Sequence, residues 1–308
     1  MVIPQIILFI FCGGVLLFYG ADYLVKGGSH LARIFGISSL VIGLTIVAFG
    51  TSLPELVVSL VAALRGSESI AVGNVIGSNI ANVGLVIGLS ATLFHIVLGK
   101  HKFFRDLNFL LVISLVFIWM AFDGIIERWE GIILFIGVIT YTYFRISYGK
   151  SDYPIDKDEG SVLINIFYVI IGIIGLTIGS NLFVDGVIRL AKILGVSEFV
   201  LGATVAAYGT SLPELTTSLV AAYRKEAAIS IGNIIGSNIF NILCVIGLVS
   251  TINPLNVENS VFYFEIPVML IYTLALYPLL RMRTRIFKRY SIILLVGYLA
   301  FVSYLFVR

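Results

Sequence analysis

The pentapeptide Thr-Ser-Leu-Pro-Glu occurs twice in this chain, at residues 51–55 and again at residues 210–214, which is 159 positions later. Each copy lies inside a long apolar stretch. A glutamate in the middle of a membrane span is energetically costly, so its presence there points to a function. Because both copies keep the same hydroxyl residues and the same proline, we predict that the chain is an internal duplication. Each half would then contribute one carboxylate to a shared site.

The duplication extends beyond the pentapeptide, at the same spacing and without a gap. The matched positions lie in the first three apolar segments of each half, whereas the later segments have diverged. In the first half they are Gly20, Gly43, Thr45, Ala48, Gly50, Gly73, Asn74, Gly77, Ser78, Asn79 and Asn82. Their partners are Gly179, Gly202, Thr204, Ala207, Gly209, Gly232, Asn233, Gly236, Ser237, Asn238 and Asn241.

The composition places the chain in a membrane. Hydrophobic residues make up 59% of the sequence and charged residues 12%, whereas soluble domains carry about 25% charged residues. The apolar segments match the roughly 20 residues that a helix needs to cross a bilayer. They run near 4–25, 38–64, 70–95, 106–123, 129–147, 162–184, 197–223, 228–251, 262–281 and 287–307. The sequence therefore predicts an all-α integral membrane protein with ten transmembrane helices, and no basic cluster in it is typical of nucleic-acid binding.

The number of segments in each half predicts how the two halves are arranged. Residues 1–147 form a first predicted repeat of five helices, residues 162–308 form a second, and the polar stretch 148–161 links them. Because five is an odd number, the second copy must enter the membrane in the opposite orientation. This inverted-topology arrangement is typical of secondary transporters, whose site lies near the middle of the bilayer between the repeats.

The basic residues predict the orientation of the chain. The side that holds both termini carries five of the 20 lysines and arginines, namely Arg65, Arg128, Arg189, Lys192 and Arg308. Because cytoplasmic loops carry the excess of basic residues, the opposite side, with the linker, is predicted to be cytoplasmic and both termini extracellular. The first segment follows no basic region and precedes no small-residue cleavage site, so we expect a retained span and not a signal peptide.

The residues around each pentapeptide predict an opened helix lined by oxygen atoms. Thr51 and Ser52 lie four and three positions before Glu55, so hydroxyls and carboxylate share one helical face. Pro54 has no amide proton, which deprives the carbonyl of Gly50 of its helical partner. Carboxylate, hydroxyl and freed carbonyl oxygens together suit hard cations such as Ca²⁺ and Na⁺. The second copy repeats every element, at Ala207, Gly209, Thr210, Ser211, Pro213 and Glu214.

A plainer interpretation is that the two prolines only kink their helices and that each glutamate pairs with a basic residue. The nearest candidates in sequence, Arg65 and Arg224, lie at the span ends, too far along the helix to reach the glutamates. The duplication of the whole motif also argues against this interpretation.

The segments that follow each pentapeptide carry further polar residues. Ser78 and Asn82 are four positions apart, as are Ser237 and Asn241, so each pair can present two neutral oxygens to the same site. The glycines four apart, Gly73, Gly77, Gly232 and Gly236, are explained by close packing of membrane helices. For Asn74, Asn79, Asn233 and Asn238 the sequence leaves two roles open, in the site or as hydrogen-bonding contacts between helices.

The two Gly-Thr-Ser-Leu-Pro-Glu segments, each followed by Gly-Asn-x-Ile-Gly-Ser-Asn-Ile, resemble the alpha-repeats of the sodium/calcium exchanger family. The resemblance implies an antiporter that exchanges Ca²⁺ for several Na⁺ by alternating access, with the glycine-rich first and sixth segments sliding across a fixed bundle. It implies Glu55 and Glu214 as central ligands, the backbone oxygens of Ala48 and Ala207 as sodium ligands, and a surrounding ring of side chains. That ring comprises Thr51, Ser52, Ser78, Asn82, Thr210, Ser211, Ser237 and Asn241.

The chain departs from some relatives at one ligand position. Some microbial and potassium-dependent relatives carry an aspartate where this chain has Asn241. The site therefore has two carboxylates, which argues against potassium co-transport. Two glutamates neutralise one Ca²⁺, whereas three Na⁺ would leave one net positive charge, so we expect exchange to be electrogenic with about three Na⁺ per Ca²⁺.

Other functions remain open from the sequence. A proton/calcium exchanger could use the same two glutamates, because burial disfavours the charged form of a carboxylate, but protons do not require the hydroxyl groups. A cation channel is less consistent with an inverted repeat, since pores more often use rings of residues from several subunits. With three histidines in the chain we expect no enzyme and no cofactor. We expect a multi-pass cell-membrane protein that functions as a monomer, with Ca²⁺ and Na⁺ as its substrates.

Overall fold

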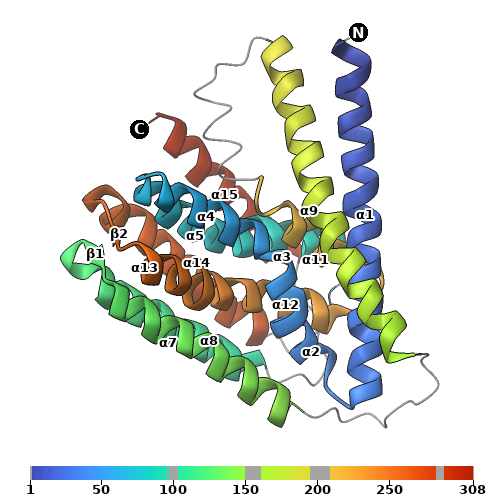
Figure 1. Ribbon diagram of the computed structural model, residues 1–308, viewed down its shortest axis with the longest axis horizontal. Helices are drawn as coiled ribbons and strands as arrows, with labels where there is room; N and C mark the ends of the chain where they lie inside the picture. The colour runs from blue at the N-terminus through green and yellow to red at the C-terminus, as the bar shows by residue number, and fades with distance from the viewer. Residues whose placement is uncertain are drawn as a thin grey trace.

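A computed structural model describes residues 2–94, 96, 103–149, 161–194, 209–281 and 288–307. The protein is an all-helical membrane protein (Figure 1). Eight helices among these residues are long and apolar enough to cross a membrane, and the bent pair Ser39–Thr51 and Leu53–Leu64 would make a ninth. The predicted seventh span, 197–223, lies partly outside the described residues, and its second part is helix α11, Leu212–Tyr223.

Two long helices lie side by side along one edge of a bundle of shorter helices (Figure 1). They are α1, Val2–Phe35, and α9, Val162–Ile193. At 1.5 Å per residue each is about 50 Å long, which exceeds the thickness of the apolar core of a bilayer, so each helix tilts or extends beyond that core. The predicted segments 4–25 and 162–184 were too short. Each helix continues through a more polar end, and that end packs against the beginning of the other helix.

Glycines bring α1 and α9 into close contact. A Cβ atom added at Gly20 would collide with the backbone of α9, and one added at Gly172 would collide with the backbone of α1. Gly13 and Gly179 are equally close to the facing helix. These glycines of the first and sixth predicted segments thus have a packing role, whereas a Cβ added at Gly14 would meet no described residue of another helix within 4 Å.

The remaining helices form the bundle. In the first repeat they are α2 (Ser39–Ile42), the π-helical turn η1 (Gly43–Val47), α3 (Ala48–Thr51), α4 (Leu53–Leu64), α5 (Glu68–Ala81), the π-helical turn η2 (Asn82–Ile87), α6 (Gly88–Leu93), α7 (Phe103–Met120), the 3₁₀ turn η3 (Ala121–Asp123) and α8 (Arg128–Tyr148). In the second they are α11, α12 (Ala227–Phe240), the π-helical turns η4 (Asn241–Ile246) and η5 (Val261–Glu265), α13 (Gly247–Ile252), α14 (Ile266–Arg281) and α15 (Lys288–Val307). Strands β1 (Ile125–Ile126) and β2 (Leu255–Asn256) pair antiparallel and join the loops at one end.

Helices α5 and α12 form the centre of the bundle and are the most buried of the candidate spans. Helix α12 packs closely against α2 and η1, where Gly232 lies against Gly43 and Gly236 lies against Leu44 and Ala48. This supports the predicted packing role of Gly232 and Gly236. Their counterparts Gly73 and Gly77 have no such close neighbour among the described residues.

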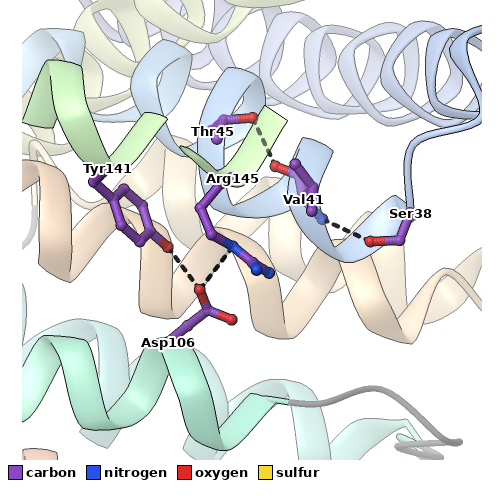
Figure 2. Close-up of polar contacts among 6 residues, drawn as sticks. All are labelled: Ser38, Val41, Thr45, Asp106, Tyr141 and Arg145. Atoms are coloured by element: carbon purple, nitrogen blue, oxygen red, sulfur yellow. Dashed lines mark hydrogen bonds and ion pairs between the residues drawn. The ribbon is translucent and has the colours of Figure 1, made fainter. Parts of the chain in front are cut away.

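The buried carboxylate of Asp106 on α7 contacts two side chains of α8, Tyr141 and Arg145 (Figure 2). The Asp106 carboxylate accepts a hydrogen bond of 3.0 Å from the Tyr141 hydroxyl and lies 2.9 Å from Nε of Arg145. Just beyond α8, the carbonyl of Gly149 accepts a hydrogen bond of 3.0 Å from the amide of Ser38, the residue that caps α2. The end of α8 is thereby tied to the start of the helix that leads into the first pentapeptide.

Candidate ion-binding site

Each pentapeptide opens its helix at the serine. In the first repeat α3 ends at Thr51, α4 begins at Leu53, and the two are bent by 42° at Ser52. In the second, Ser211 has the same backbone conformation (φ −83°, ψ 4°, against −84° and 5° at Ser52) and precedes α11. The predicted kink is confirmed. It places each glutamate in the first turn of a helix, where the partial positive charge of the helix N-terminus favours a carboxylate.

The carbonyl of Ala48 is only partly freed by this break. It still accepts a hydrogen bond of 3.0 Å from the amide of Ser52, and the Thr51 hydroxyl lies 3.2 Å away. A carbonyl oxygen has two lone pairs, so the second one takes either the Thr51 proton or a cation. Ala207, the predicted counterpart, lies outside the described residues.

The two glutamates come together at the centre of the bundle, and both are fully buried. Ser52 of the first repeat donates a hydrogen bond of 3.1 Å to Oε1 of Glu214 in the second. Ser78 lies 3.4 Å from Oε1 of Glu55 and accepts from Ser211 of the second repeat at 3.3 Å. The two motifs are thus interleaved into one cluster, as the duplication predicts.

The remaining predicted side chains surround the same cluster. Ser237 lies 3.5 Å from Oε1 of Glu214 and 3.3 Å from the Thr51 hydroxyl. Thr210 is also buried beside the cluster and contacts Asn74 of the first repeat. The predicted serines and threonines are therefore all in or beside one cluster, and the backbone oxygen of Ala207 lies outside the described residues.

Asn82 and Asn241 each begin a π-helical turn inside what the sequence predicts as a continuous span. Such turns are rare and occur mostly at functional sites. Both side chains are fully buried, and each amide nitrogen donates to an asparagine of the opposite repeat. The carboxamide oxygens of both have no hydrogen-bond partner among the described residues.

Four buried oxygens at this site lack a hydrogen-bond partner in the described part of the chain: Oε2 of Glu55, Oε2 of Glu214, Oδ1 of Asn82 and Oδ1 of Asn241. Buried polar atoms normally have a partner. A hard cation would satisfy oxygens of this kind. The described residues hold no group of three or more His, Cys, Asp or Glu side chains that could bind a metal, so neutral oxygens must supplement the two carboxylates.

The plainer interpretation of the glutamates is not supported. Among the described residues no ion pair joins either glutamate to a lysine or arginine, and Arg224 pairs instead with Asp22 of α1. Sequence reasoning missed Ser59 and Ser218, which lie behind the site and accept hydrogen bonds from Asn74 and Asn233. The sequence could have identified them, because the two serines are separated by the same 159 positions as the other repeated residues.

Comparison with known proteins agrees with this arrangement. The family model described as sodium/calcium exchanger protein matches residues 5–147 and 164–307. The chain is 34% identical to the sodium/calcium exchanger MaX1 of Methanosarcina acetivorans, over 97% of this chain and 98% of that protein. It is 39% identical to an uncharacterized membrane protein of Methanocaldococcus jannaschii, over 86% of each.

A solved structure also matches. The sodium-calcium exchanger NCX_Mj, soaked with zero Na⁺ and Ca²⁺, superposes with a TM-score of 0.87 at 35% identity, covering 98% of this chain and 99% of that one. The duplicated motifs, the interleaved carboxylates and these matches lead to one conclusion: the chain belongs to the sodium/calcium exchanger family.

Proposed function

We propose that this protein exchanges Na⁺ for Ca²⁺ across the cell membrane by alternating access. One observation carries the proposal: Glu55 and Glu214, one from each repeat, lie fully buried in one cluster, and each has an oxygen without a partner among the described residues. Intramembrane carboxylates mark pathways of ions or protons, and a bound cation would offset the charge of this pair. The names of relatives that match nearly the whole chain support the choice of Na⁺ and Ca²⁺.

The two ions would use different parts of the cluster. Ca²⁺ lies between the two carboxylates, which neutralise it, and takes further oxygens from Asn82, Asn241 and the nearby serines. Na⁺ uses the neutral oxygens at the edges, including the Thr51 hydroxyl and the Ala48 carbonyl, which lie next to each other. Because several ligands are shared, the two ions compete, and competition at one site is what couples their opposite movements.

The transport cycle would move net charge. With two carboxylates, a site filled by one Ca²⁺ is neutral and a site filled by three Na⁺ carries one positive charge. We propose about three Na⁺ per Ca²⁺, with both termini outside the cell and one chain sufficient for transport. A membrane potential then contributes about 2.3 kcal/mol per 100 mV for each charge moved.

The experiment is Ca²⁺ uptake into proteoliposomes preloaded with Na⁺, compared with vesicles preloaded with K⁺, choline or acid. Uptake that requires the outward Na⁺ gradient and is lost in Glu55→Gln and Glu214→Gln supports the proposal. Glu258→Gln, at an exposed glutamate, is the matched control and keeps wild-type uptake. Uptake driven by internal acid without Na⁺ would replace the proposal with proton/calcium exchange.

The stoichiometry is tested separately. An inside-positive potential, set with a K⁺ gradient and valinomycin, should speed the Ca²⁺ uptake that Na⁺ efflux drives, and an inside-negative potential should slow it, because the cycle carries positive charge outward. A Ca²⁺ flux that does not respond to the imposed potential would exclude three Na⁺ per Ca²⁺ and favour an electroneutral exchange.

A further inference from the structure

Two asparagines of the bundle contact the site across the boundary between the repeats. Asn233, from the second repeat, accepts a hydrogen bond of 3.1 Å from the hydroxyl of Thr51 in the first. Asn74, from the first repeat, accepts one of 3.2 Å from Thr210 in the second. Neither asparagine is among the ligands that the family resemblance implies.

The other end of each amide fixes its orientation. The Asn233 amide nitrogen lies 3.4 Å from the backbone carbonyl of Glu214 and 3.0 Å from the hydroxyl of Ser218. A carbonyl can only accept a hydrogen bond, so the nitrogen must face Glu214 and Oδ1 must face Thr51. Oδ1 also only accepts, and therefore Thr51 must be the donor in this contact.

Asn74 repeats this geometry in the other half. Its amide nitrogen lies 3.3 Å from the backbone carbonyl of Glu55 and 3.0 Å from the hydroxyl of Ser59. By the same reasoning, the hydroxyl proton of Thr210 points to Asn74. The duplication has thus kept an entire four-residue hydrogen-bond arrangement.

The direction of this proton matters because a hydroxyl has only one. When the Thr51 proton points to Asn233, it is not directed at the Ser237 hydroxyl, which lies 3.3 Å away, and the lone pairs of the Thr51 oxygen can accept from Ser237 or bind a cation. The alternative acceptor, the Ala48 carbonyl, is only 3.2 Å away. A proton turned toward Ala48 would occupy the carbonyl lone pair that a cation needs.

A second pair of asparagines, Asn79 and Asn238, contacts the predicted ligands Asn241 and Asn82, again across the boundary between the repeats. Asn238 accepts from the amide nitrogen of Asn82 at 2.9 Å, while its own nitrogen donates to the backbone carbonyl of Asn79 at 3.3 Å. Asn79 accepts from the amide nitrogen of Asn241 at 3.0 Å. Both ligand nitrogens are therefore held, and the unpartnered oxygens of Asn82 and Asn241 are left for a cation.

We propose that Asn74, Asn79, Asn233 and Asn238 are positioning residues, each of which orients a ligand side chain of the opposite repeat so that only oxygen lone pairs face the bound cation. The inference rests on the proposed function and assigns these residues a task within it. In all four contacts the ligand side chain donates and the asparagine oxygen accepts. Hydrogen bonds that serve only to pack membrane helices would not need the same direction of donation each time. The neutral ligands of Na⁺ depend on the arrangement most, since Ca²⁺ is held chiefly by the two carboxylates.

The test is a double-mutant cycle on Asn233→Leu and Thr51→Val. Na⁺ and Ca²⁺ binding are each measured as the cation-dependent rise in unfolding temperature of the detergent-solubilised protein. We expect Asn233→Leu to raise the Na⁺ concentration for half-maximal effect about tenfold and to change that for Ca²⁺ by less than threefold. In the Thr51→Val background, where no hydroxyl remains to be oriented, Asn233→Leu should change the Na⁺ response by less than twofold.

A merely structural role predicts a different result. Asn233→Leu would then weaken Na⁺ and Ca²⁺ alike, and its effect would add to that of Thr51→Val; either outcome overturns the proposal. If Asn233→Leu does not fold, the same double-mutant cycle on Asn74→Leu and Thr210→Val tests the proposal in the other half of the site. Asn108→Leu, at an exposed asparagine that contacts Tyr277, is the control and leaves both responses unchanged.

The readout also separates this inference from the proposed function. Binding in detergent requires no transport, so a protein that shows the non-additive Na⁺ effect but exchanges no Ca²⁺ would refute the transport activity alone. A wild-type protein whose unfolding temperature responds to neither cation would refute both.

Discussion

Asp22 of α1 forms an ion pair with Arg224 at the end of α11, and the positions related to them by the duplication, Asn181 and Arg65, cannot form one. A second polar contact joins α1 to the residues that follow α11. Glu226 accepts a hydrogen bond of 2.8 Å from Ser29 of α1. The inverted repeat is therefore not symmetric in how its long helices are attached to the bundle.

Burial shows the same asymmetry. Helix α1 packs along α11, and Thr217 and Val220 of α11 are 0% and 4% exposed. Their counterparts on α4, Val58 and Val61, are 41% and 40% exposed. The bundle is thus covered by α1 at the end predicted to be cytoplasmic and is less covered at the opposite end. In the proposed alternating-access cycle, with the predicted orientation, this would be a conformer that is closed toward the cytoplasm.

Breaking the ion pair should shift the balance between conformers. We expect Asp22→Asn to make Val220→Cys more reactive toward a thiol reagent, because α1 leaves α11 more often. A partly exposed ion pair contributes about 0.2–1 kcal/mol, so the increase should not exceed roughly fivefold. The labelling rate is measured in a background without Cys12 and Cys244.

The related positions offer the reverse experiment. Asn181→Asp places a carboxylate on α9 that can pair with Arg65 when α9 closes over α4, so it should lower the reactivity of Val61→Cys. If neither substitution changes the labelling of either site, the ion pair has no part in selecting the conformer.

Much of the site could be predicted from the sequence, because the duplication marks its residues twice. A single Thr-Ser-Leu-Pro-Glu segment predicts only that a carboxylate lies near a kink, whereas two copies predict that the two halves share a site. The structure places Glu55 and Glu214 in one cluster accordingly. The crossed contacts of Asn74 and Asn233 could not be predicted, because a pattern along one chain does not show which helix of the other repeat lies opposite.

The ends and breaks of helices were the least predictable features. The apolar pattern ends near residue 25, yet α1 continues to Phe35 because its polar end is stabilised by Glu226 and by α9. The π-helical turns at Asn82 and Asn241 leave no mark in hydropathy. Both are decided by tertiary packing, which an apolar pattern does not encode.

A glycine within the contact between α1 and α9 should not tolerate alanine, whereas a glycine of α1 outside this contact should. Gly172→Ala places a Cβ against the backbone of α1 at Gly20 and Leu24. Such overpacking costs about 1–3 kcal/mol, so we expect a clear fall in the unfolding temperature of the detergent-solubilised protein. Gly14→Ala is the matched control: outside the surrounding turns of α1, no atom of the described residues lies within 4 Å of its added Cβ, and alanine favours a helix over glycine by about 0.5–1 kcal/mol. Equal effects at the two positions would contradict the close contact.

The buried charges between α7 and α8 predict an unusual pattern of stability (Figure 2). Asp106 is 1% exposed and the Arg145 side chain 12% exposed, and one oxygen of Asp106 has no partner among the described residues. Removal of one partner leaves a buried charge uncompensated, which typically costs about 3–5 kcal/mol. We therefore expect Arg145→Met to lower the unfolding temperature strongly, with Asp106→Leu doing the same.

The double variant Asp106→Leu/Arg145→Met should recover most of that loss, because replacing both members of a buried pair by apolar side chains is often neutral or stabilising. The Tyr141 hydroxyl would lose its acceptor, at a cost of about 1–3 kcal/mol, so adding Tyr141→Phe should complete the recovery. Since Asp106 and Arg145 lie outside the ion cluster, the folded fraction of the double variant should keep wild-type Na⁺ dependence of Ca²⁺ uptake. A double variant as unstable as the sum of its single variants would mean that the pair stabilises the protein through packing and not through mutual charge compensation.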